Sequence, residues 1–293
     1  MLYQAELYPE NESHPLAERW KKGKVDGALK APDTGFVTDL SRPWPFGLDG
    51  PRWWLAAVAG VLLLILAVLF DQKVLAWVQG WSPEVIEWLG GVSRYGESGW
   101  ILIPSGILFG VIWLLSLLVR WRLMRLMLIE QSWLFAFIFC AVGLSSLVAA
   151  LLQRVIGRGQ PMQVEGVPAL GFRPNLFDLD FQSFPSGHAA TAFALAMAFG
   201  FLSARWFWAA MGFAVVIGVS RLATGMNYPS DVLGGAALGV LGAYLVRYLF
   251  SLREMMFRSG ADGAIKARKT VAMWRYLDLK RQRSGPKPRP DRP

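Results

Sequence analysis

Three groups of polar residues stand at the edges of long apolar stretches, and their residue types suit anion binding or catalysis. The first is QRVIGRGQP at residues 153–161, the second is FPSGH at residues 184–188, and the third is SRLATGMNYPSD at residues 220–231. Polar and ionisable residues beside membrane-spanning segments are costly, and they commonly mark a functional site. Together the three groups define one candidate site.

Several residues in these groups suit a phosphate ligand. Arg158 and Arg221 can each fork onto phosphoryl oxygens. Ser186 and Gly187 stand at a predicted helix start, where free backbone N–H groups face an anion. Arg154 either adds to the positive charge or sits at the membrane interface. These residues predict a phosphate-binding site.

Two further residues could handle protons or orient their neighbours. His188 can pass a proton to a leaving oxygen near neutral pH. Asp231 lies at the predicted start of the last helix, where its carboxylate either orients a neighbouring side chain or caps the helix. Ser186 has the same structural alternative, because serine is a preferred helix cap.

Six apolar segments must position these groups. A spanning helix needs about 20 apolar residues. Three segments are long enough, at residues 53–70, 100–119 and 132–152. Three more are shorter and rich in Gly and Ala, at residues 189–204, 206–220 and 232–246. Because small residues let helices approach closely, and Gly235 and Gly239 form a GxxxG pair, we expect these three to be inner helices. Residues 71–99 look like an interfacial amphipathic segment.

The composition indicates an all-α membrane protein. Hydrophobic residues make up 54% and charged residues 17%, whereas a soluble domain carries about 25% charge. Cys140 is the one cysteine, so no intramolecular disulfide can form. Two histidines exclude a multi-histidine metal site, and we expect no metal and no cofactor. The net charge of +9 does not indicate nucleic-acid binding, because its placement follows membrane topology.

Lysine and arginine residues are concentrated on one side of the predicted helices. They fill residues 1–52 and 251–293, with Arg120, Arg122 and Arg125 between two spans. This bias places both termini in the cytoplasm and the three polar groups on the periplasmic or outer side. It predicts an N-terminal arm at 1–52, a six-helix membrane domain at 53–250 and a basic tail at 251–293. A bacterial inner membrane is the expected location. Residues 254–283 either adhere to anionic lipid or form a solvated tail.

The three groups resemble, in order and spacing, the phosphatidic acid phosphatase type 2 / vanadium haloperoxidase superfamily. The resemblance covers about residues 95–250, and the family motifs are K-x6-R-P, P-S-G-H and S-R-x5-H-x3-D. The segment from Pro185 to His188 fits the second motif fully. Ser220, Arg221 and Asp231 fit the third at the right spacing.

The resemblance implies a six-helix bundle of the lipid phosphatase type and a phosphoryl-transfer site that needs no metal. In the family, the third-motif histidine attacks phosphorus and the aspartate orients it. The second-motif histidine protonates the leaving group. On this chain, His188 is then the acid/base, Asp231 the orienter and Arg221 a phosphate clamp, with Ser186 and Gly187 as donors.

Three positions depart from the family pattern. Asn227 stands where the nucleophilic histidine is expected, and an amide nitrogen has no basic lone pair. Gln153 and Gln160 replace the lysine and arginine of the first motif. Arg154 and Arg158 compensate for part of that charge. Losing the nucleophile and two clamps together predicts a fall in turnover on the order of 10³-fold or more.

Three hypotheses follow from these departures. The first is a membrane protein that binds lipid phosphate or related headgroups and has lost conventional phosphohistidine chemistry. The second is an enzyme of altered chemistry that uses His188 as acid/base. The third is a structural bundle in which Ser186 and Asp231 only cap helices. Membrane lipids with phosphorylated headgroups are the expected ligands, and a membrane-protein partner or a second copy of the chain is a further partner class.

Overall fold

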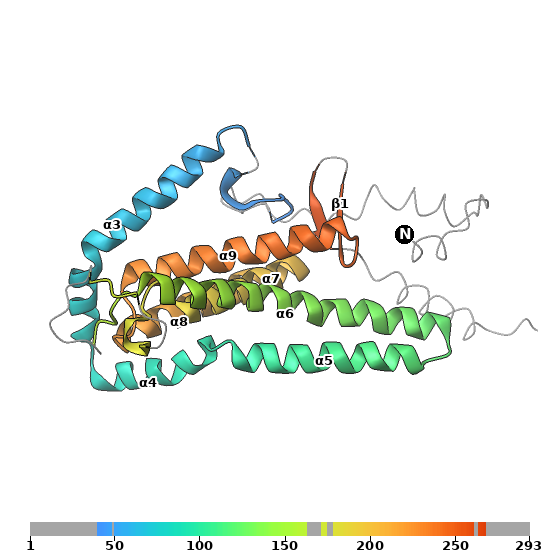
Figure 1. The fold of residues 1–293 in the computed structure, drawn as a ribbon, viewed down its shortest axis with the longest axis horizontal. Coiled ribbons are helices and arrows are strands. Elements are labelled where there is room, and N and C mark those ends of the chain that lie inside the picture. The colour runs from blue at the N-terminus through green and yellow to red at the C-terminus, as the bar shows by residue number, and fades with distance from the viewer. Residues whose placement is uncertain (1–39, 49, 163–170, 175–177, 261–262, 268–293) are drawn as a thin grey trace, which may run out of the picture. The chain divides into compact units, whose positions relative to one another are not determined.

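The chain folds as a helical bundle with one small β-hairpin, as the computed structural model of Figure 1 shows. The structure describes residues 40–48, 50–162, 171–174, 178–260 and 263–267. Most of the expected N-terminal arm and of the basic tail lies outside them. The α-helices are α3 (Trp53–Gln79), α4 (Pro83–Ser93), α5 (Gly99–Leu118), α6 (Arg122–Ile156), α7 (Gly187–Leu202), α8 (Ala204–Ala223) and α9 (Pro229–Leu252). The short elements are η1 (Pro45–Gly47), η2 (Arg94–Gly96), η3 (Leu179–Phe181), β1 (Phe257–Ser259) and β2 (Ile265–Ala267).

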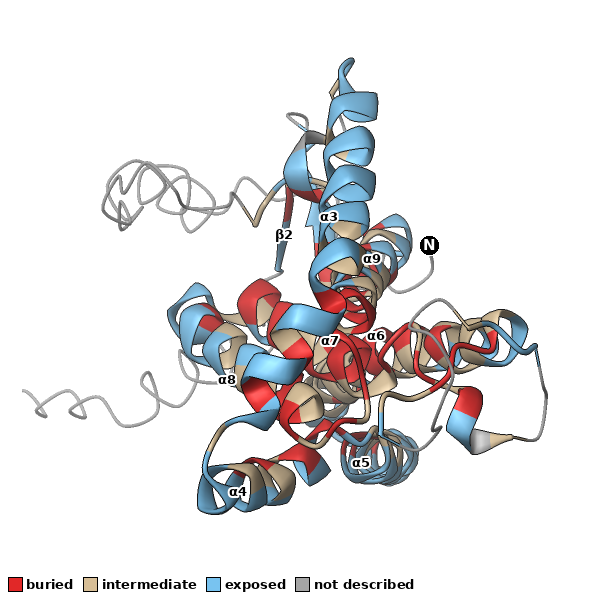
Figure 2. Ribbon diagram, turned by 90° about the vertical axis from the view of Figure 1, so that its left-hand side faces the viewer, coloured by how far each residue is buried: buried red, intermediate tan, exposed pale blue. Residues whose placement is uncertain are grey.

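The helices confirm the predicted fold class. Within the described residues, α3, the stretch Pro83–Leu118, α6, α8 and α9 are long and apolar enough to cross a membrane. The apolar helix α7 is shorter, with 16 residues. Most residues of α3 and α5 are exposed or half-buried, as the ribbon colours of Figure 2 show, which suits helices that face lipid.

Helix α7 is the central inner helix, and it packs against α6, α8 and α9. Its small residues are almost all buried. Two glycines of α9 allow the close approach: a Cβ at Gly235 would lie 2.2 Å from the Ser186 carbonyl oxygen, and one at Gly239 would lie 2.4 Å from that of Ala190. The GxxxG pair therefore sets the contact that brings the second and third polar groups together.

The region expected to be interfacial differs from the prediction. Helix α3 does not end near residue 70 but continues to Gln79, and α4 follows as a separate helix. Asp71 lies inside α3 and is completely buried. Its carboxylate has partners elsewhere in the fold, which hydropathy along a single segment cannot reveal.

The other end of the bundle holds a hairpin instead of a plain basic tail. Strands β1 and β2 pair antiparallel, and Phe257 and Ile265 are buried in the same cluster as Phe137. The backbone N–H of Ile265 donates to the Ser41 carbonyl oxygen at 2.7 Å. Arg247 of α9 donates to the carbonyl oxygens of Leu40 and Arg42.

Candidate functional site

The three polar groups meet in one pocket with a volume of about 210 Å³. They reach it from the end of α6, the start of α7 and the connection between α8 and α9. One lining residue, Gln182, lies in none of the three groups. The pocket is lined by Gln153, Gln160, Gln182, Gly187, His188, Arg221 and Asn227.

His188 lines the pocket without a protein partner. Among the described residues, no group forms a hydrogen bond with its ring. Its position is set by packing, since a Cβ at Gly96 would lie 2.9 Å from the His188 Cβ. The short helix η2 thus packs against the imidazole, which lines the pocket and is available to a ligand there.

Arg221 supplies positive charge to the pocket. Its Nε donates to Oδ1 of Asn227 at 3.0 Å, and one terminal nitrogen donates to Oγ of Ser93 at 3.2 Å. No carboxylate lies within ion-pair distance of it in the described part of the chain. The Glu97 carboxylate acts on it from farther away. A half-buried cation with no carboxylate in direct contact can still attract an anionic ligand.

Asn227 has its amide fully engaged. Its Oδ1 accepts from Nε of Arg221 and from Oγ of Ser186, the latter at 3.2 Å. Its Nδ2 donates to the carbonyl oxygen of Ser183 at 2.7 Å and lies 3.4 Å from Oγ of the same residue. The side chain is a fixed hydrogen-bonding element of the pocket wall.

Asp231 does not contact the Asn227 amide, which differs from the expectation that it orients this residue. Its Oδ1 accepts from Arg158 at 2.5 Å. Its Oδ2 accepts from Oγ of Ser183 at 2.5 Å and from the backbone N–H of Tyr228 at 2.7 Å. The last contact is part of a capping box at the start of α9. Among the described residues, Ser183 hydrogen-bonds both to the Asp231 carboxylate and to the Asn227 amide, and so joins the two side chains.

Arg158 lies beneath the pocket and does not line it, in contrast to its expected role as a clamp. It is 2% exposed. Its guanidinium forms ion pairs with Asp71 at 2.7 Å and with Asp231 at 2.5 Å. It also donates to Oγ of Ser230 at 2.7 Å and lies 4.3 Å from the ring centre of Tyr228. Burial raises the pKa of the Tyr228 phenol, which keeps that ring neutral.

The remaining predicted residues divide between the wall and the outside. Gln153 donates to the carbonyl oxygen of Pro185 at 2.8 Å, and Gln160 lines the opening. Ser186 caps α7, because its Oγ accepts from the N–H of Ala189 at 3.4 Å. Arg154 is exposed and outside the pocket lining.

Four contributors were missed in the sequence: Gln182, Ser93, Asp71 and Ser183. Ser93 and Asp71 lie far from the motifs along the chain, and only the isolated acid within an apolar helix was a signal for Asp71. Ser183 precedes the FPSGH group directly, but nothing in its type distinguished it. Among the described residues, no three His, Cys, Asp or Glu side chains are grouped so that they could hold a metal ion.

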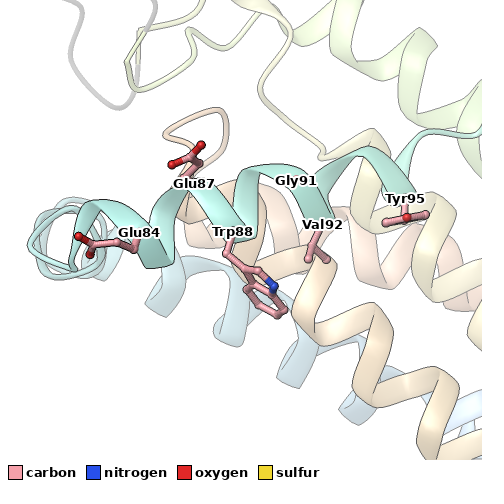
Figure 3. Close-up of a pocket in the computed structure, with 6 residues that line it drawn as sticks. All are labelled: Glu84, Glu87, Trp88, Gly91, Val92 and Tyr95. Carbon is pink, nitrogen blue, oxygen red and sulfur yellow. The ribbon is translucent and has the colours of Figure 1, made fainter.

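A larger and shallower hollow lies along α4 and contains none of the predicted residues. Its volume is about 500 Å³, and Glu84, Glu87 and Trp88 are among its lining residues. Figure 3 shows that these side chains point to different sides of the helix instead of converging on one point. It does not form a site comparable with the pocket at His188.

Related proteins are found by sequence. Residues 131–255 match the PAP2 superfamily model. The chain is 30% identical to a lipid A 1-phosphatase of Rhizobium johnstonii, over 78% of this chain and 94% of the relative. It is also 30% identical to a lipid A 1-phosphatase of Rhizobium etli, over 72% of this chain and 91% of the relative.

Two solved structures also match. The Aquifex aeolicus LpxE crystal structure aligns with a TM-score of 0.42 and 20% identity, covering 60% of this chain and 94% of its own. A PAP2-type phosphatidylglycerolphosphate phosphatase from Bacillus subtilis aligns with a TM-score of 0.45 and 22% identity, covering 67% and 96%. On the family model and the sequence relatives, the chain belongs to the PAP2 superfamily of membrane lipid phosphatases.

Proposed function

We propose that this protein holds the phosphorylated headgroup of a lipid at the outer leaflet and has lost conventional phosphohistidine turnover. One observation carries the proposal. Asn227 occupies the place of the nucleophile, and its amide is fully engaged by Arg221, Ser186 and Ser183. An amide in this position has no lone pair with which to attack phosphorus.

The groups around Asn227 support the loss of turnover. Asp231, whose family role is to orient an imidazole, is engaged by Arg158, Ser183 and the backbone of Tyr228. Gln153 and Gln160 are neutral where the family has cations. In phosphoryl transfer the protein acts mainly through positioning and charge stabilisation. The combined loss corresponds to a rate lower by about 10³-fold or more.

The same pocket is suited to binding. Arg221 supplies positive charge without a carboxylate in direct ion-pair contact among the described residues, although the Glu97 carboxylate acts on it from farther away. The amides of Gln153, Gln160 and Gln182 supply neutral hydrogen-bond donors. Gly187 begins α7, where backbone N–H groups favour an anion. Because the sequence relatives are lipid A 1-phosphatases, a glycolipid phosphate belongs in the first group of ligands to test.

The distribution of positive residues supports the orientation that we propose. The inner leaflet lies at the hairpin end and the pocket faces the periplasm, with both termini in the cytoplasm of a bacterial cell. Accessibility labelling of a cysteine placed at Gln182, in a Cys140→Ser background, tests this from outside intact cells. Labelling only after the inner membrane is opened would contradict the orientation.

Phosphate release by the purified protein in nanodiscs is the decisive experiment. The panel contains lipid A, phosphatidic acid, phosphatidylglycerophosphate and a polyprenyl pyrophosphate, with His188→Ala, Arg221→Ala and Asn227→His beside the wild type. We expect no release by the wild type, and lipid binding that weakens in Arg221→Ala.

A second function is favoured by one observation, the absence of a protein partner on the His188 ring among the described residues. An imidazole available in this way can act as a base on water or on a substrate hydroxyl. Release by the wild type that vanishes in His188→Ala would replace the binding proposal with an enzyme whose mechanism has no phosphohistidine.

A further inference from the structure

Asp71 is a buried carboxylate that none of the three motifs contains. It is completely buried, although it belongs to an apolar membrane helix. Its Oδ1 accepts from the backbone N–H of Ser230 at 2.9 Å. Its Oδ2 accepts from Oγ of Ser230 at 2.6 Å and from Arg158 at 2.7 Å. These hydrogen bonds therefore join Asp71 to the first and third polar groups of the site.

Asp71 changes the charge available to the pocket. Arg158 divides its two terminal nitrogens between Asp71 and Asp231, so this group carries one positive and two negative formal charges. Asp231 contacts Ser183, which in turn holds Asn227 in the pocket wall. The group of Arg158, Asp71 and Asp231 thus carries a net negative formal charge behind the pocket wall, and Arg221 is the cation in that wall. Charges interact strongly across a poorly solvated protein interior.

We infer that Asp71 is a specificity-determining residue. By binding the second terminal nitrogen of Arg158, Asp71 keeps that cation out of the pocket lining. The pocket then favours a monoanionic phosphodiester headgroup over a dianionic phosphomonoester. The inference rests on the proposed headgroup-binding function. It goes further than that function because it assigns a charge class to the ligand and a cause to the selection.

The ligand chemistry provides the contrast. A phosphomonoester has a second ionisation near pH 6 and carries close to two negative charges at pH 7, whereas a diester carries one at any pH used here. The glutamine amides of the lining can hydrogen-bond either group without adding charge. Arg221 is the cation of the described lining, and the Glu97 carboxylate offsets part of its charge. The second charge of a monoester therefore finds no further cation in this lining and is disfavoured by the carboxylates behind the wall.

The experiment compares two probes that differ by one methyl group, dihexanoyl phosphatidic acid and its methyl phosphodiester. Affinities are measured by calorimetry for the full chain in an uncharged detergent at low salt. At pH 8 we expect wild type to bind the diester more tightly by about tenfold, the effect of one unit charge near the pocket at an effective dielectric constant of about 20.

Asp71→Asn is the informative variant, because the amide keeps the size and the acceptor oxygen and removes the charge. It should bring the affinity ratio close to one. Glu84→Gln is the matched control, since it removes one negative charge from an exposed position on α4, where water screens it, and it should leave the ratio unchanged. Arg221→Ala should weaken both probes.

A pH series on the wild type tests the same point without any variant, in case Asp71→Asn does not fold. From pH 8 to pH 5 the monoester gains a proton, and the ratio should approach one. His188 and Arg221 are the titratable groups that line the pocket within the described residues, and Glu97 acts on Arg221. At pH 5 both probes carry close to one negative charge, so these groups act almost equally on the two probes there.

The outcomes separate the two proposals. Binding of neither probe would contradict the headgroup site itself, and the assignment of Asp71 would fail with it. Binding of both probes with equal affinity at pH 8, tighter binding of the monoester, or a ratio unmoved by Asp71→Asn would overturn the assignment and leave the headgroup site standing.

Discussion

Arg158 donates to Oδ1 of Asp231 at 2.5 Å. The Asp231 carboxylate thus binds an arginine, whereas the family resemblance implies that it would bind an imidazole. The pair is buried, and Asp71 completes it from α3. With asparagine at position 227, the Asp231 carboxylate is therefore still paired within the described structure. A satisfied ion-pair network lies behind the polar pocket.

Restoring the histidine alone should restore little activity. In Asn227→His, both oxygens of Asp231 are already engaged by Arg158, Ser183 and Tyr228, so the new imidazole lacks its orienting partner. We expect phosphate release to stay within about tenfold of the wild type, because positioned acid–base groups contribute only when their geometry is right. The measurement is phosphate release from the lipid panel.

The matched variant adds Gln153→Lys and Gln160→Arg to Asn227→His. If charge stabilisation is the missing element, the triple variant should exceed the single one by 10²-fold or more. Substantial activity from Asn227→His alone would contradict both reasons given for its inactivity, the engaged Asp231 carboxylate and the neutral first motif.

Removing Arg158 should destabilise the protein, whereas removing Arg221 should not. Arg158→Ala leaves two buried carboxylates without a cation, and breaking a buried pair in this way costs about 3–5 kcal/mol. Arg221 is half-buried, and no carboxylate lies within ion-pair distance of it in the described structure, so Arg221→Ala should change thermal stability by little and lower headgroup affinity instead. Thermal unfolding in detergent and probe binding, measured on both variants, distinguish these two kinds of effect. Equal loss of stability in both would contradict the division of roles.

A methyl group at Gly235 should disturb the pocket through the packing of two helices. Its Cβ would lie 2.2 Å from the Ser186 carbonyl oxygen, so α7 and α9 must separate, at a cost of about 1–3 kcal/mol. Ser186 would move with its hydrogen bond to Asn227. We expect Gly235→Ala to lower both the unfolding temperature and headgroup affinity. Gly212→Ala on α8 is the control, because a Cβ there meets nothing within 4 Å; a similar loss in that variant would rule out the packing explanation.

The sequence predicted the elements of the site better than the contacts inside it. Apolar length and small-residue content were enough to place the helices, and the three motif groups do meet in the pocket at His188. The direction of Arg158 was not predictable, because it depends on Asp71, which is 87 residues away along the chain. A cation near a motif suggests a ligand contact unless its counter-ion is known. The side chain of Asp231 was ambiguous for the same reason, since capping and orienting use the same oxygens.

The hairpin end was mispredicted because local charge outweighed a weak apolar signal. Phe257 follows two methionines and Ile265 follows an alanine, and both become core residues by packing in one buried cluster with Phe137 and Phe250 at the end of the bundle. The register places Arg258 opposite Lys266 on the outer face of the hairpin. Such a three-residue pair of strands has no clear sequence pattern, because pairing depends on the surface that it covers.

Arg247 should hold this end of the bundle together, and its loss should loosen the hairpin without changing the pocket. Arg247 is 1% exposed, and its guanidinium donates to the carbonyl oxygens of Leu40 and Arg42. The guanidinium carbon lies 4.1 Å from the ring centre of Phe201 and 4.6 Å from that of Tyr244. Ser41, between Leu40 and Arg42, accepts from the N–H of Ile265. Arg247→Met keeps the bulk and removes the donors, so amide hydrogen exchange at residues 257–259 and 265–267 should accelerate by tenfold or more, about 1.4 kcal/mol of lost protection. Arg253→Met, at an exposed position just after α9, should leave that exchange unchanged. Headgroup binding should be equal in both variants, and a loss of binding in Arg247→Met would show that the two ends of the bundle are coupled.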